Sequence, residues 1–150
     1  MQITTKQIKE LREKTGAGVS DIKKALEQSG GNTAKALVEI EKKLGGAVLK
    51  KAGRETKAGL VEGYIHANGR IGVLVEILCE TDFVARNPEF KELAHDLAMQ
   101  VAALDPAEVA VLLKQQFIKD QGKTILEVLN EAVGKFGENI KIERFIRIEI

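Results

Sequence analysis

The residues best suited to chemistry lie in a short connection, Thr81-Asp-Phe-Val-Ala-Arg-Asn87, between a predicted strand and a predicted helix. The apolar run 71–78 favours a buried strand before this connection, and Pro88 suits the first turn of a helix after it. Asp82 stands beside the aromatic ring of Phe83, where solvated turns usually carry Gly, Asn, Ser or Pro. Such a pair suits a turn that enters a partner's pocket. The alternative is that Phe83 folds back into its own core and Asp82 caps the next helix.

The other candidate residues give little support to covalent, metal or nucleotide chemistry. Cys79 falls on a strand face, and neither His66 nor His95 is spaced to assemble with it. Neither histidine has a carboxylate or thiol at i+3 or i+4 that would complete a set of metal ligands. Gly16-Ala-Gly18 is too short for a P-loop and is typical of a helix stop. We therefore expect no catalytic residue, no metal and no cofactor, and an action through binding.

The first part of the chain is expected to be helical. Apolar residues at helical spacing predict three short helices before residue 45, separated by glycine turns at 15–18 and 30–32. Thr4 or Thr5 can cap the first helix. A linker rich in Lys and Gly, either helical or irregular, spans residues 45–57.

The rest of the chain predicts a sheet with helices. Two runs rich in β-branched residues, 60–66 and 71–79, flank Asn68-Gly69, which is a strong signal for a hairpin. Amphipathic helices are expected at 88–104 and from a Thr124 cap to Gly137. Between them, residues 107–123 predict a short helix and then a turn.

A final strand closes the chain and carries isoleucines in alternation. Arg144 interrupts its apolar face, which indicates a bulge or a sheet edge there. The residues that we place together on this face are Ile140, Ile142, Ile146, Ile148 and Ile150. The predicted fold class is α+β, with a three-helix bundle followed by a three-stranded antiparallel sheet packed with helices. We place the domain division after residue 54, giving a helical domain 1–54 and an α+β core 55–150.

Charge and composition bound the function. Residues 1–54 carry a net charge of +6 and residues 55–150 a net charge of −5. The basic head could contact RNA or an acidic protein surface, but it contains no aromatic residue on which bases could stack. No apolar run approaches the roughly 20 residues that cross a bilayer. The N-terminus lacks an apolar signal core, and the single cysteine fits a reducing compartment, so we expect a cytoplasmic protein.

Five motifs occur in order along the chain: Lys9-Glu-Leu-Arg12, Thr15-Gly-Ala-Gly18, Asp21-Ile-Lys-Lys-Ala-Leu26, Cys79-Glu-Thr-Asp-Phe-Val-Ala-Arg86 and Gly137-Glu-Asn-Ile140. Together they closely resemble the translation elongation factor Ts family, from about residue 3 to residue 150. Members of that family are guanine-nucleotide exchange factors for elongation factor Tu. The resemblance implies a binding factor rather than an enzyme. It also implies that the factor binds elongation factor Tu in its GDP-bound and nucleotide-free states, and neither nucleic acid nor membrane directly.

The resemblance also implies two contact regions. Asp82 and Phe83 would intrude beside the partner's nucleotide and magnesium site, flanked by Thr81, Val84 and Arg86. The helical head, which is similar to a ubiquitin-associated domain, would supply a second contact. Its residues are Leu11, Arg12, Gly16, Gly18 and Val19, although Leu11 is equally well an ordinary core leucine. This chain has Val19-Ser20 where the family often carries two methionines, which are adaptable at an interface.

The chain also departs from the family pattern in length. Larger relatives carry a duplicated core, and other short ones carry a longer helical insertion before the last strand, where this chain has only residues 105–123. A second copy could cover the open sheet, giving a homodimer with Cys79 near the seam. Two other functions stay open. One is an RNA- or ribosome-associated module that uses the basic head, and the other is a protein-interaction scaffold.

Overall fold

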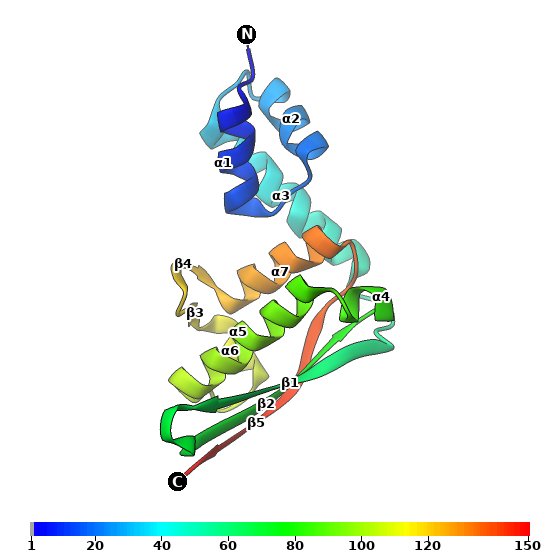
Figure 1. Ribbon diagram of the computed structural model, residues 1–150. Helices are drawn as coiled ribbons and strands as arrows, with labels where there is room; N and C mark the ends of the chain where they lie inside the picture. The colour runs from blue at the N-terminus through cyan, green and yellow to red at the C-terminus, as the bar shows by residue number, and fades with distance from the viewer. Residues whose placement is uncertain (1) are drawn as a thin grey trace. The chain divides into compact units, whose positions relative to one another are not determined.

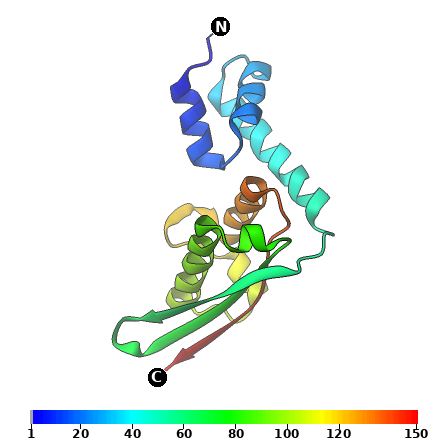
Figure 2. The same cartoon turned by 45° about the vertical axis from the view of Figure 1, so that its right-hand side comes forward.

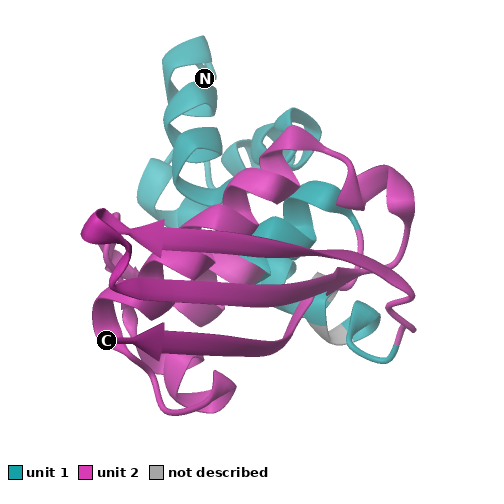
Figure 3. Cartoon of the chain, turned by 60° about the horizontal axis from the view of Figure 1, so that its bottom comes forward, with its two compact units in different colours: residues 1–53, 130–137 teal, residues 54–129, 138–150 magenta. Residues whose placement is uncertain are grey.

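The computed structural model describes residues 2–150, apart from the side chains of Ala47 and Leu49. Contacts divide the chain into two compact units, residues 1–53 with 130–137 and residues 54–129 with 138–150 (Figure 3). Helix α7, Ile125–Phe136, contributes residues to both units. Our division of the chain into domains after residue 54 stays a prediction.

The first unit contains the three expected helices: α1 (Thr5–Thr15), α2 (Val19–Gln28) and α3 (Thr33–Lys51) (Figure 1). Thr4 caps α1 in a reciprocal capping box with Gln7, and Gly16 ends the helix at a φ of 70°. The expected apolar faces meet in one core, formed by Leu11, Ala17, Ile22, Ala25, Leu26, Ala36 and Ile40.

Helix α3 is longer than the sequence predicts, because it continues through Gly45-Gly46 to Lys51. A glycine inside a helix costs about 1 kcal/mol relative to alanine, so this continuation depends on tertiary packing. Leu44 packs so closely on Gly134 of α7 that a Cβ at residue 134 would overlap the leucine methyl group. Of the two forms predicted for the linker 45–57, the helical one is therefore correct as far as Lys51.

The second unit is built on the predicted three-stranded antiparallel sheet. Its strands are β1 (Ala58–His66), β2 (Ile71–Cys79) and β5 (Lys141–Glu149), in the order β1-β2-β5. The predicted hairpin joins β1 to β2 through η1 (Ala67–Gly69), where Asn68 and Gly69 both have positive φ, 59° and 70°. Within the described residues, no helix is long and apolar enough to cross a membrane.

Helix α5, Pro88–Leu104, packs on the inner face of β1 and β2 (Figures 1 and 2). The amphipathic pattern expected for this helix is present, because seven apolar residues along it are buried: Phe90, Leu93, Ala94, Leu97, Ala98, Val101 and Ala102. They face the buried side chains of β2, which are Val73, Val75, Ile77 and Cys79. The core of the second unit therefore lies between this helix and the sheet.

The predicted single face of the last strand is wrong in part. A register shift at Glu76/Ile77 leaves Glu143 without a partner opposite it, which is the bulge expected near Arg144. Because one extra residue reverses the alternation, Ile142 is buried while Ile146 and Ile148 point outward. Phe145 and Arg147 take the inward positions. Two of the three guanidinium nitrogens of Arg147, Nε and Nη2, donate to the Ala102 carbonyl.

Residues 105–124 form α6 (Val109–Lys114) and a small ribbon of β3 (Gln116–Phe117) and β4 (Asp120–Thr124). The short helix was expected, but the ribbon was not. Gln100 on α5 is fully buried, donates to the Gln116 carbonyl at 2.9 Å and accepts from the Ile118 amide at 2.9 Å. The ribbon thus depends on one buried amide of a distant helix. The predicted Thr124 cap of α7 is present, with its Oγ1 accepting from the Glu127 amide at 3.2 Å.

Candidate functional site: an exposed aromatic turn

The segment that follows β2 is a single helical turn, α4 (Asp82–Ala85). Thr81 is its N-cap, with Oγ1 accepting from the Val84 amide at 3.4 Å. The next helix begins immediately, because Asn87 caps α5 by accepting from the Glu89 amide and Pro88 takes its first position. The caps are therefore Thr81 and Asn87, and the alternative in which Asp82 caps the following helix is wrong.

The ring of Phe83 is 85% exposed, which excludes the alternative that it folds into its own core. Asp82 and Arg86 are exposed on the same turn, and a shallow hollow beside the ring is lined by Asp82, Phe83, Arg86, Asn87 and Pro88. Val84 differs from its neighbours, since only 4% of it is exposed. Its side chain anchors the turn to the core and presents no surface to a partner.

A distant carboxylate holds the start of this turn. Glu138 Oε1 accepts from the backbone amides of Glu80 and Thr81 at 3.1 and 3.0 Å. Its other oxygen, Oε2, accepts from the Thr81 hydroxyl at 2.7 Å. The residue belongs to the motif Gly137-Glu-Asn-Ile140, to which the sequence assigned no role.

Cys79 closes β2 next to the turn and is fully buried. Burial raises the pKa of this thiol to about 11, and the nearby carboxylates of Glu138 and Asp82 add to the effect. The thiol is therefore protonated and a poor nucleophile at neutral pH. It also faces α5 from the inner side of the sheet, and our expectation that it lies near a seam between copies stays a prediction.

His66 lies at the hairpin end of β1, at the opposite end of the strand register from Cys79, and His95 lies on α5. Tyr64 joins them, because its hydroxyl lies 2.9 Å from His66 Nδ1 and its ring meets the His95 ring edge-on at 5.7 Å. Sequence spacing did not reveal this group, since it depends on the pairing of a strand with a helix. Among the described residues, no group of three or more His, Cys, Asp or Glu side chains is arranged to hold a metal ion.

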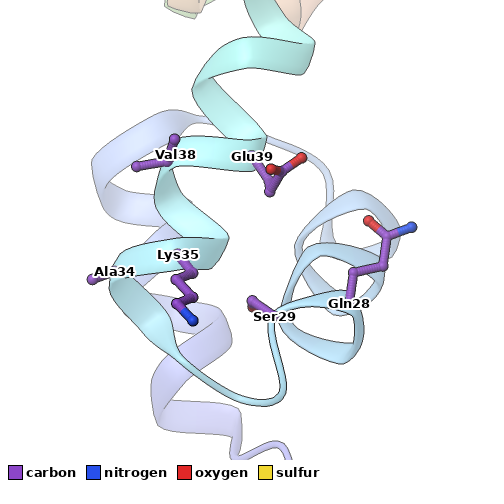
Figure 4. A pocket seen from close by; sticks show the side chains of 6 residues that line it. All are labelled: Gln28, Ser29, Ala34, Lys35, Val38 and Glu39. Carbon is purple, nitrogen blue, oxygen red and sulfur yellow. The ribbon is translucent and has the colours of Figure 1, made fainter.

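The residues implicated in a second contact divide into two sets. Leu11 is fully buried in the helical core, so it is an ordinary core leucine. Arg12, Gly18 and Val19 are exposed around the α1–α2 turn, and Gly16 is half-buried there. A separate hollow in the same unit lies between the end of α2 and the start of α3 (Figure 4). It is lined by Gln28, Ser29, Ala34, Lys35, Val38 and Glu39, none of which we predicted as a contact.

One further surface follows from the bulge in β5. The face of the sheet that points away from α5, here called the outer sheet face, exposes large apolar side chains from all three strands. Leu74 lies at its centre, paired with Gly63 on one side and Ile146 on the other. The exposed apolar residues of the outer sheet face are Val61, Ile65, Leu74, Ile146, Ile148 and Ile150.

An exposed ring on a turn held by hydrogen bonds is typical of a protein that acts by binding another protein. Comparison with known proteins agrees with this class. A family model for Elongation factor TS matches residues 80–150. An elongation factor Ts of Thermotoga neapolitana is 42% identical over 193 aligned positions, covering 100% of this chain and 98% of the relative. Those of Desulforamulus reducens and Nitratidesulfovibrio vulgaris are 41% and 39% identical, covering 99% and 100% of this chain and 89% and 98% of the relatives.

The chain belongs to the elongation factor Ts family. Membership makes it a translation elongation factor and implies nucleotide exchange on elongation factor Tu. The alignment with the Thermotoga relative spans 193 positions against 150 residues here, so at least 43 positions have no counterpart in this chain. This agrees with the expected departure in length.

Proposed function

We propose that the chain promotes GDP release from elongation factor Tu by inserting the Asp82–Phe83 turn beside the partner's nucleotide and magnesium site. The observation that carries the proposal is the 85% exposure of the Phe83 ring on a turn with a buried anchor, Val84. Thr81 and Arg86 flank the ring and contact the partner around it. The chain binds both the GDP-bound and the nucleotide-free partner, in the cytoplasm, and does no covalent chemistry.

The physical basis is thermodynamic linkage between the factor and GDP. If each favours a different arrangement of the same GTPase domain, binding one weakens the other by an equal factor. Such coupling free energies are typically about 1–3 kcal/mol, and strong exchange needs the upper end of that range or more.

Phe83 can supply a large part of this coupling free energy. Full burial of a phenylalanine side chain contributes roughly 1.5–3 kcal/mol, and a ring that is exposed in the free factor gains it only in the complex. That gain stabilises a partner in which the nucleotide site is opened. GDP phosphates depend on magnesium for charge neutralisation, so loosening the ion's ligands weakens GDP binding. Asp82 assists by rearranging hydrogen bonds around that site and need not bind the ion itself.

The helical head provides a second contact through the exposed residues of the α1–α2 turn. Arg12 can pair with a partner carboxylate, while Val19, 39% exposed, adds apolar area. Gly16 and Gly18 contribute only backbone to this contact. Leu11 does not take part, because it is buried in the head's own core.

A direct test is to load elongation factor Tu with fluorescent GDP and add this chain in increasing excess. We expect the release rate to rise and then saturate with factor concentration. A release rate that stays at its spontaneous value in excess factor would end the proposal.

We propose in addition that the outer sheet face forms a homodimer. Its six exposed apolar side chains lie on a three-stranded sheet, and the glycines Gly63 and Gly72 among them allow a flat, close approach of a second copy. Two such faces are self-complementary under two-fold symmetry. A contiguous group of exposed large apolar side chains is typical of an interaction site.

The outer sheet face can be tested with Leu74→Glu. A charge at the centre of the face would be desolvated in the dimer, so we expect this variant to sediment as a monomer where the parent chain is a dimer. Val38→Glu is the matched control, since Val38 is also exposed but lies on α3. The dimer is excluded if the parent chain is monomeric at about 100 µM, a concentration at which even weak micromolar dimers form.

A further inference from the structure

Two segments of the second unit, 58 residues apart in sequence, meet at the base of the aromatic turn. Glu138 is the second residue after the end of α7, and all three of its hydrogen bonds described above are to Glu80 or Thr81. Hydrogen bonds to an ionised carboxylate are shorter and stronger than neutral ones. The Glu138 carboxylate thus fixes two consecutive amides and the hydroxyl that caps α4.

The contact is reciprocal, because the Glu80 carboxylate accepts a hydrogen bond from the residue that follows Glu138. Its Oε2 accepts from the Asn139 amide at 2.6 Å and lies 3.7 Å from Nη1 of Arg54. The Asn139 side-chain amide in turn donates to the Arg54 carbonyl at 2.9 Å. We call these interactions of Glu80, Glu138, Asn139 and Arg54 the carboxylate clamp.

The turn needs such support, because α4 is only four residues long. A single helical turn fixes several backbone dihedrals for very few hydrogen bonds and is unstable by itself. Thr81 joins the clamp to the turn, since its hydroxyl donates to Glu138 and accepts from the Val84 amide. Because the Thr81 hydroxyl donates its proton to the Glu138 carboxylate, its oxygen is left to accept from the Val84 amide, and the first hydrogen bond strengthens the second.

We propose that Glu138 is a positioning residue for nucleotide exchange, which holds the Thr81 cap and thereby presents the Phe83 ring in a fixed orientation. This role rests on the proposed function of Phe83. A pre-ordered ring binds without the entropic cost of ordering the turn at the moment of contact. Loss of the clamp should therefore reduce exchange, because Glu138 acts through its hydrogen bonds to Glu80 and Thr81.

The first test examines the free chain by NMR, with no partner present. Glu138→Ala removes all three acceptors, so we expect residues 82–85 to lose their helical chemical shifts. The amides of Glu80 and Thr81 should exchange with solvent at least about tenfold faster, while the inner amides of β2 stay protected. Glu138→Gln keeps one oxygen that can accept from the two amides but cannot accept at both positions. Its chemical shifts and amide exchange rates should therefore lie between those of the parent and of the alanine variant. Unchanged shifts in Glu138→Ala would overturn the inference.

The second test is a double-mutant cycle in the GDP-release assay. We expect Glu138→Ala to lower the maximal release rate about tenfold in the parent chain and less than about twofold in a Phe83→Ala background, because the two residues act through one step. A general loss of stability would instead lower the maximal release rate by the same factor in both backgrounds. Glu143→Ala is the matched control, since Glu143 is exposed and its carboxylate pairs with Lys141.

The outcomes separate the two proposals. A parent chain that does not accelerate GDP release overturns the proposed function, and the NMR comparison still decides whether Glu138 orders the turn. If the parent chain is active but Glu138→Ala lowers the release rate equally in both backgrounds, the positioning role is overturned and the proposed function stays intact.

Discussion

Phe83→Ala is expected to slow factor-stimulated GDP release at least about tenfold, equivalent to about 1.4 kcal/mol, without unfolding the chain. The ring is 85% exposed in the free factor, so its removal leaves no cavity and should change the free energy of unfolding by less than about 0.5 kcal/mol. Its removal does abolish the burial that the complex would gain. The loss should therefore appear in exchange and not in stability.

Stopped-flow release of fluorescent GDP measures this effect, and circular dichroism with urea unfolding checks the fold. Val38→Ala is a matched control, because it also removes an exposed apolar side chain but from α3. It should exchange like the parent. If Phe83→Ala retained the parent's maximal rate, the ring would have no part in the mechanism.

Phe90→Ala should produce the opposite result, a large loss of stability. Phe83 lies on α4, whereas Phe90 lies on the next helix, α5, and is fully buried. Helix α5 packs on β1 and β2. Replacing a buried phenylalanine by alanine typically costs about 3–5 kcal/mol through lost burial and the cavity left behind. We expect a loss in that range.

Urea unfolding followed by circular dichroism would give the stability change of Phe90→Ala. Under conditions where this variant remains folded, its exchange rate should stay near that of the parent, since the ring of Phe83 is untouched. A cost below about 1 kcal/mol would contradict the packing described for α5. The two phenylalanines thus separate a partner-facing ring from a structural one.

Much of the core could be predicted from local patterns. The strand β2 and the helix α5 carry long, regular apolar patterns, and both lie where the sequence predicts them. The last strand shows the limit of such reasoning. Its bulge was expected near Arg144, but the reversal of Ile146 and Ile148 to the outer sheet face depends on where one unpaired residue, Glu143, falls in the register.

Other features depend on contacts that no local pattern contains. The β3–β4 ribbon is held by Gln100, a polar residue buried on an otherwise apolar helix face. At the site, residue types alone left Phe83 open between core and surface. They also could not show that Val84 and Leu11 are buried. The Glu138 contacts join segments 58 residues apart, so only the fold reveals them.

The most direct test of the exchange mechanism is GDP release from elongation factor Tu at varied magnesium, with the parent chain and with Phe83→Ala. We expect the parent chain to accelerate release most at high magnesium and less as the ion is chelated, because spontaneous release is then already fast. Phe83→Ala should accelerate release weakly at every magnesium concentration. Equal acceleration by both chains across the magnesium range would show that the Phe83 ring does not open the nucleotide site.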